Sequence, residues 1–137
     1  RRPHARMGLS DAGAPCGAIC DGGTPTFMPP HWTRDRSRGP KLDLPYVVHR
    51  QTRQTASLYG LTDRGLVAPG LRADLNVIDY DGLRFGPPRM AFDLPANGRR
   101  LVQKADGYRA TFVAGVQTVA DDEFTGELPG RLIRGPR

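Results

Sequence analysis

The clearest pattern of apolar and polar positions lies between Asp43 and Gly60. The apolar residues there recur at spacings of three, four or seven: Leu44, Val47, Val48, Thr55, Leu58 and Tyr59. This period predicts an amphipathic helix over residues 43–59. Asp43 can cap its first turn, Pro45 suits a position whose N–H needs no partner, and Gly60 can end the helix in the left-handed conformation. We expect the apolar face of this helix to cover another layer of structure.

Shorter runs after Gly60 predict a change from helix to strand. Three segments have strand composition: residues 73–79, 100–104 and 108–114. The turn signal Ala68-Pro69-Gly70 precedes the first of them, and Gly115 separates the third from residues 116–120. We therefore expect a β-hairpin over residues 111–120.

The first forty residues give weaker signals. Residues 5–11 suit the end of a strand, and residues 8–13 suit its exit into a loop. Residues 22–40 are rich in proline and predict a long loop with a helical turn around residues 31–36. Loops of this length inside compact domains usually carry function.

Composition narrows the classes of protein that fit. The chain has 137 residues, of which 38% are apolar, with 17 Gly and 13 Pro, so its core should be thin. No apolar run approaches the ~18–20 residues of a membrane span. The net charge of +6 is dispersed and lacks the interleaved aromatic residues of a nucleic-acid platform. Cys16 and Cys20 have no second pair at zinc-site spacing, which favours free thiols in a reducing, cytoplasmic compartment.

Residues 9–14, with the sequence LSDAGA, are the first candidate for chemistry. Barrel enzymes place catalytic carboxylates at the carboxyl ends of strands, and small neighbouring residues let a ligand approach. Asp11 fits that position. The alternative is that Asp11 only forms a turn, since aspartate hydrogen-bonds readily to its local backbone.

The second candidate is the pattern G-x-x-x-P-G-x-x-A-D-L-x-V-x-D, which runs from Gly65 to Asp79. It resembles the segment by which metal-dependent amidohydrolases leave their barrel and enter a small β-sandwich. Residues 53–61 resemble the preceding helix end of that superfamily, and residues 113–116 and 125–131 its closing hairpin and tail. Within it, the chain is most similar to the D-aminoacylase branch, the N-acyl-D-amino-acid deacylases, on four segments: residues 10–13, 25–27, 31–36 and 93–101.

The resemblance implies an α/β plus β fold, namely the end of a (β/α)8 barrel followed by a small β-sandwich domain. Residues 1–62 would supply the last barrel strand, loop and helix, and residues 63–137 the β-sandwich portion and tail. The chain would then be the C-terminal segment of a longer enzyme. That enzyme would hydrolyse non-peptide C–N bonds in a small-molecule amide, such as an N-acyl-D-amino acid.

The same resemblance implies a role for Asp11 as catalytic acid/base beside a divalent metal, usually zinc, with Asp11 also a possible ligand. A bound metal acidifies its water, and a nearby carboxylate can carry the proton. Ser10 and His31 would contact substrate, although a packed or surface His31 is the alternative. The family's metal ligands begin with a His-x-His pair, which this chain lacks, so no complete metal site is expected here. A different class also fits the residues, a non-catalytic, basic, β-rich module that binds an acidic partner.

Overall fold

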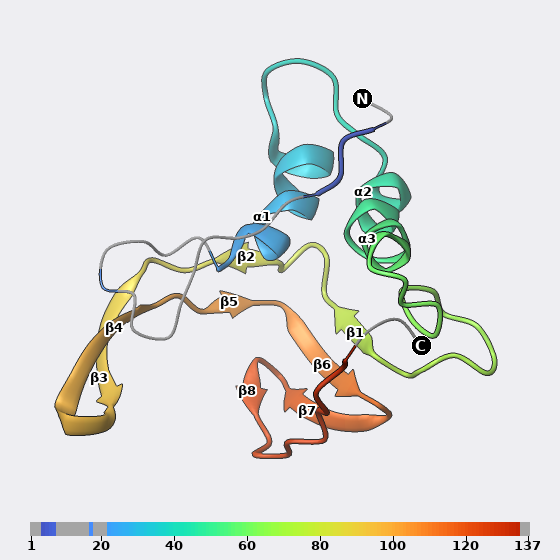
Figure 1. The fold of residues 1–137 in the computed structure, drawn as a ribbon. Helices are drawn as coiled ribbons and strands as arrows, with labels where there is room; N and C mark the ends of the chain where they lie inside the picture. Colours follow the sequence, from blue (N-terminus) through green and yellow to red (C-terminus); the bar gives the residue numbers. More distant parts are fainter. Residues whose placement is uncertain (1–3, 8–16, 18–21, 135–137) are drawn as a thin grey trace.

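The computed structural model describes residues 4–7, 17 and 22–134 (Figure 1). Its helical elements come first in the chain, and all of its strands follow. The helices are α1 (Thr24–Pro30), a π-helix (His31–Asp35), α2 (Leu44–Gln51) and α3 (Arg53–Leu58). The strands are β1 (Leu75–Ile78), β2 (Arg84–Phe85), β3 (Arg89–Leu94), β4 (Gly98–Val102), β5 (Ala105–Asp106), β6 (Tyr108–Val113), β7 (Val116–Ala120) and β8 (Glu123–Phe124), with a 3-10 turn at Pro95–Asn97.

The prediction of a long loop over residues 22–40 is wrong for residues 24–35, which form α1 and the π-helix. Proline does not prevent this helix, because one proline lies in its first turn, where the missing N–H has no partner anyway. Pro29 and Pro30 then remove two donors, and the backbone continues as a wider turn in which the Arg36 N–H bonds the His31 carbonyl at 3.0 Å. The helical turn expected around residues 31–36 is confirmed. Residues 5–7 carry no strand, and the rest of that predicted strand end lies outside the described residues.

The helix expected over residues 43–59 is present but divided at Thr52. The backbone of Thr52 leaves the helical region (φ −112°, ψ −92°), while its hydroxyl donates to the Val48 carbonyl at 2.8 Å. Asp43 has the extended backbone of an N-cap but makes no capping hydrogen bond, so that detail of the prediction is wrong. Gly60 has a φ of +69°, as predicted for the residue that ends the helix.

The β-part contains one four-stranded antiparallel sheet in the order β1-β6-β7-β8 and two separate pairs, β2-β5 and β3-β4. Figure 1 shows the β3–β4 hairpin extending away from the four-stranded sheet. The predicted strands at residues 73–79 and 108–114 are confirmed, and the strand predicted over residues 100–104 begins and ends two residues earlier, as β4. The hairpin of β6 and β7 turns at Ala114 and Gly115, whose φ values of +52° and +82° suit a type I′ turn.

The motif that begins at Gly65 has a structural role in this arrangement. The Asp74 carboxylate accepts a hydrogen bond from the Ala114 N–H at 2.8 Å and another from Arg72 Nε at 2.8 Å. The Gly115 N–H donates to the Ala73 carbonyl at 2.9 Å. Residues directly before β1 therefore hold the turn of the hairpin that pairs with it.

Arg34 joins the helical part to the turn before β2. Its guanidinium donates to the backbone carbonyl of Tyr80 and to those of Asp81 and Leu83, the last two at 3.1 and 3.0 Å. Leu83 is only 1% exposed. Among the described residues, the other buried apolar side chains are Val47, Ala56, Pro29 and Pro30. The core is therefore as thin as the composition predicts, and the apolar face expected on the helix over residues 43–59 is only partly covered.

Candidate functional site

Ser10 and Asp11 are the main site residues predicted from the sequence. They lie outside the described residues, as do Cys16 and Cys20. Their roles remain predictions. His31 is described, and it lies at the junction of α1 and the π-helix. Its ring stacks on Phe27 with centroids 4.6 Å apart and meets the edge of the Trp32 ring at 5.1 Å. This packing accounts for His31 without a ligand, and a substrate contact stays a prediction.

The described residues do not fit a metal ion. Over residues 4–7, 17 and 22–134, no group of three or more His, Cys, Asp or Glu side chains comes together in a way that could hold one. His4 and His49 are both exposed. The ligands of a catalytic metal would therefore have to come from outside these residues.

Several aspartates of the β-part are bound in ion pairs. Asp79 accepts from Arg109 at 2.9 Å, and Asp106 accepts from Arg84 at 2.8 Å. The pKa of Asp79 lies below its ordinary value, first because the Gly82 N–H donates to it and then because of Arg109. A carboxylate stabilised in its charged form in this way is poorly suited to exchange protons near neutral pH.

Asp74 is bound in the same manner. Its partial burial raises the pKa, but Arg72 and the Ala114 N–H favour the charged form more strongly, so the pKa of Asp74 is lowered overall. The acidic residues of the Gly65–Asp79 pattern therefore serve the fold rather than a reaction.

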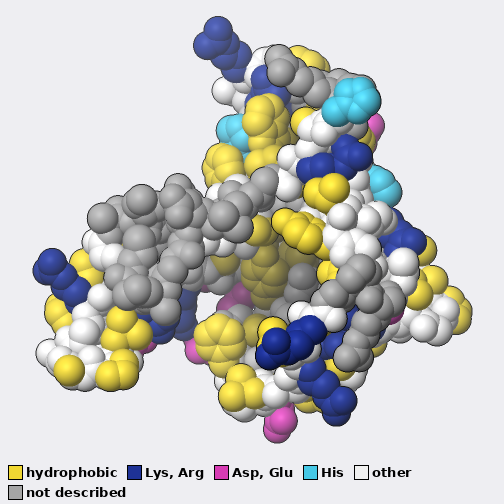
Figure 2. All heavy atoms as spheres, in the orientation of Figure 1, with side chains coloured by type: hydrophobic (Ala, Val, Ile, Leu, Met, Phe, Trp, Pro, Cys, Tyr) yellow, Lys and Arg dark blue, Asp and Glu magenta, His cyan; other side chains and the backbone are white. Residues whose placement is uncertain are grey.

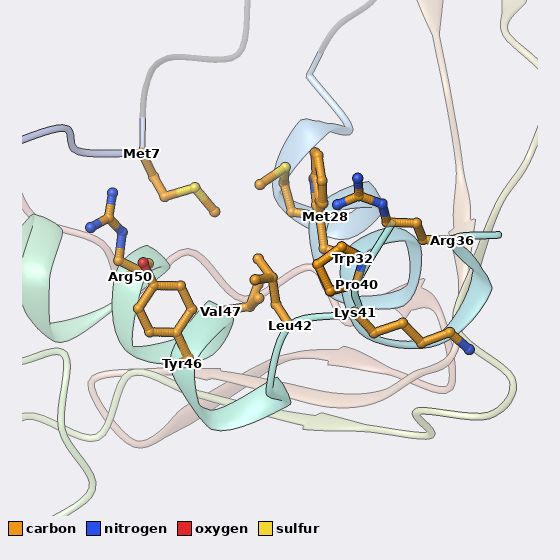
Figure 3. Close-up of a pocket in the computed structure, with 10 residues that line it drawn as sticks. All are labelled: Met7, Met28, Trp32, Arg36, Pro40, Lys41, Leu42, Tyr46, Val47 and Arg50. Atoms are coloured by element: carbon orange, nitrogen blue, oxygen red, sulfur yellow. The ribbon is translucent and has the colours of Figure 1, made fainter. Parts of the chain in front are cut away.

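A hollow lies between the helical elements. It is a cavity of about 570 Å³, and Figure 3 shows the residues that line it: Met7, Met28, Trp32, Arg36, Pro40, Lys41, Leu42, Tyr46, Val47 and Arg50. Volumes of about 300–1,000 Å³ are typical of small-molecule sites. In Figure 3 the side chains of Met7 and Met28 point toward one another, with Leu42 and Val47 beside the space between them.

Cationic side chains flank this apolar space. The Arg36 guanidinium lies over the Trp32 ring, 4.6 Å from its centroid, and that of Arg50 lies 5.8 Å from the centroid of Tyr46. Among the described lining residues none is acidic. The cavity therefore combines apolar lining residues with cationic ones, Arg36, Lys41 and Arg50.

The sequence prediction did not find this cavity. The Leu42 N–H donates to the Trp32 carbonyl at 2.9 Å, which ties together the two ends of the segment over residues 32–42. The sequence carries only a weak signal for it. An aromatic residue precedes an arginine by four positions at four places, Trp32–Arg36, Tyr46–Arg50, Tyr80–Arg84 and Phe85–Arg89, and this spacing brings side chains together only on a helix, as in the first two.

Comparison with known proteins identifies the family. The model of the amidohydrolase family matches residues 1–119. The chain belongs to the amidohydrolase family. This amidohydrolase chain is also similar to the N-acyl-D-aspartate deacylase of Alcaligenes xylosoxydans xylosoxydans, with 36% identity over 93 residues. The match covers 67% of this chain and 17% of that protein, so the chain spans only a small part of its relative's length.

The resemblance to D-aminoacylase-like amidohydrolases seen in the sequence is thereby confirmed. No solved structure gives a significant match to the chain. Within the described residues, no helix is long and apolar enough to cross a membrane. Figure 2 shows the Lys and Arg side chains scattered over the face in view, in line with the dispersed charge of the sequence.

Proposed function

We propose that this amidohydrolase chain is the C-terminal part of an enzyme that hydrolyses the amide bond of N-acyl-D-amino acids. The match to an N-acyl-D-aspartate deacylase over 93 residues carries the proposal. Residues 1–62 would form the last strand, loop and helices of a (β/α)8 barrel, and residues 63–137 a β-domain beside it. The division between helices up to Leu58 and strands from Leu75 onward supports this boundary.

A divalent metal, zinc, is part of the proposal for the complete enzyme. Since the described residues do not form a site for it, the ligands would come from elsewhere in the protein. The chemistry assigned to this chain is proton transfer by Asp11. Its carboxylate would accept a proton as water attacks the amide carbonyl, and would return that proton to the departing amine nitrogen. Ser10 and His31 would contact the substrate beside it.

The test is Asp11→Asn in the complete enzyme. Asparagine keeps the shape of the side chain but cannot exchange the proton, so kcat should fall by a factor of ~10²–10⁴. KM should change far less, because the interaction lost acts mainly in the transition state. Asp81→Asn is the matched control, since Asp81 is exposed in the described structure, and it should leave kcat unchanged.

A structural role for Asp11 predicts the opposite result. Asparagine is among the best replacements for a turn-forming aspartate, so a merely structural Asp11 would tolerate the change. Near-normal kcat in the Asp11→Asn enzyme would therefore remove Asp11 from the catalytic assignment. Loss of kcat together with loss of folded protein by circular dichroism would also count against it.

A further inference from the structure

The cavity between the helical elements has two defined walls, and the proposed hydrolytic reaction does not involve it. One wall comes from α1 and the π-helix, with Met28 and Trp32, and the other from α2, with Tyr46 and Val47. Val47 is only 2% exposed, so this wall is well packed from behind. An apolar chain placed here would be removed from water on several sides, which is a favourable transfer.

The cationic groups around the cavity are not equivalent. Arg36 is engaged in its own loop, because its guanidinium covers Trp32 and its Nε donates to the Arg38 carbonyl. A Cβ atom on Gly39 would lie 2.7 Å from an Arg36 terminal nitrogen, which shows how closely that loop packs on the guanidinium. In Figure 3 the Lys41 ammonium points away from the space between the methionines.

Arg50 is placed differently. It lies on α2 at the opposite end of the cavity from Arg36, is partly buried, and has one terminal nitrogen on the Ala5 carbonyl at 2.6 Å. A guanidinium carries five N–H donors in a planar fork, which matches the two oxygens of a carboxylate. Arg50 can therefore receive an anion while it keeps its bond to Ala5.

We propose that this cavity is a binding site for an amphipathic monocarboxylate, whose hydrocarbon part lies among Met28, Trp32, Leu42 and Val47 and whose carboxylate binds Arg50. Charge complementarity carries the choice of ligand, since the described lining residues include cations and no acid. The apolar interior excludes small inorganic anions as the best fit, because they would leave that surface without contacts. This proposal rests on the residues that line the cavity and makes no use of the role proposed for Asp11.

The chain contains a reporter for this site. It has one tryptophan, and Trp32 lines the cavity, so tryptophan emission reports on this place alone. The experiment titrates the 137-residue chain with sodium octanoate at constant ionic strength and follows Trp32 emission. We expect a saturable change with a Kd on the order of 1 mM, the range for a ligand of about ten heavy atoms. Octylammonium, with the same chain and the opposite charge, should bind at least tenfold more weakly.

Substitutions of Arg50 test whether the carboxylate of the ligand binds there. Arg50→Gln should weaken octanoate binding about tenfold, the effect of one charge-assisted hydrogen bond, and Arg50→Lys should recover part of the loss. Arg99→Gln is the control, because Arg99 is exposed on β4 and outside the cavity, and it should bind octanoate normally. If Arg50→Gln fails to fold, the octanoate and octylammonium titrations of the natural chain still decide the matter.

Four results would overturn the proposal. The first is the absence of a saturable change with octanoate, and the second is equal binding of octanoate and octylammonium. The third is Trp32 emission that depends on protein concentration without ligand, which would mean that a second copy of the chain fills the cavity. Equal losses in Arg50→Gln and Arg99→Gln would likewise show that only the net charge matters.

Discussion

Replacing Arg34 with methionine should separate the helical part of the molecule from the turn that precedes β2. Methionine retains much of the aliphatic stem and removes the guanidinium. That group donates to the carbonyls of Tyr80, Asp81 and Leu83 and forms a bidentate pair with Asp35 at 2.7 and 3.0 Å. It also lies 5.3 Å from the centroid of the Tyr80 ring.

The magnitude follows from these contacts. A hydrogen bond from a charged donor contributes about 1.5–3 kcal/mol, but the Arg34 side chain is 28% exposed, so water can replace part of what is lost. We therefore expect the free energy of unfolding to fall by about 2–4 kcal/mol in Arg34→Met. Arg34→Lys should lose nearly as much, because an ammonium cannot reach three carbonyls that a planar fork reaches.

The assay is urea unfolding followed by circular dichroism and by Trp32 emission, with the free energy taken from the midpoint and slope. Arg84→Met is the matched control, because Arg84 also pairs with an aspartate, Asp106 at 2.8 Å, but its side chain is 76% exposed. A surface pair of that kind contributes about 0–1 kcal/mol. Equal losses in Arg34→Met and Arg84→Met would refute the reasoning, since the carbonyl contacts would then contribute nothing.

Two further predictions concern the segment before β1. Gly65→Ala should destabilise the chain by about 2–4 kcal/mol, because φ is +82° and the new Cβ would lie 2.9 Å from Arg53 Cα, whereas Gly70→Ala, with the same φ and open space, should cost only about 1–2 kcal/mol in the same urea assay. The pKa of Asp74 is lowered in the folded chain, so its stabilising effect is present above the unfolded pKa of about 3.9 and is lost as pH falls through the folded value. The urea midpoint should therefore drop between pH 5 and pH 3, and this drop should be smaller in Asp74→Asn. An equal drop in Asp74→Asn and in the natural chain would contradict the assignment.

Strands β1, β4, β6 and β7 were predictable because their signals are local, whereas β2, β3, β5 and β8 were not predicted. The hairpin of β6 and β7 depends on alternating strands and on a glycine at a position where positive φ is needed, and both are visible within ten residues. The helical part was predicted less well, because its outcome depends on neighbours. Residues 24–35, which are rich in proline, form helical segments that bond to residues far along the chain. Arg34 donates to the carbonyls of Asp81 and Leu83, and the Thr26 hydroxyl lies 2.6 Å from that of Tyr108. No pattern within residues 22–40 contains that information.

The candidate site shows the same limit. The sequence pointed to Ser10 and Asp11, which lie outside the described residues, and to His31, which the structure places in a stack of rings. The cavity arises where α2 packs beside α1 and the π-helix, and the spacing between these elements along the chain does not specify how they pack. The spacing of Trp32 with Arg36 is visible in the sequence, but the same spacing occurs at Tyr80 and Arg84 outside the cavity, so it does not identify the site.

Residues 75–78 leave the ribosome before the strand that pairs with them exists. Ile78 pairs with Tyr108, thirty positions later, and at about 5–20 residues per second the intervening chain takes about 1.5–6 s to synthesise. Throughout that time β1 has unsatisfied edge groups, a state that favours aggregation. The β6–β7 hairpin, by contrast, closes through a two-residue turn, an event of about 1–10 μs. β1 therefore waits much longer for its partner β6 than β6 waits for β7.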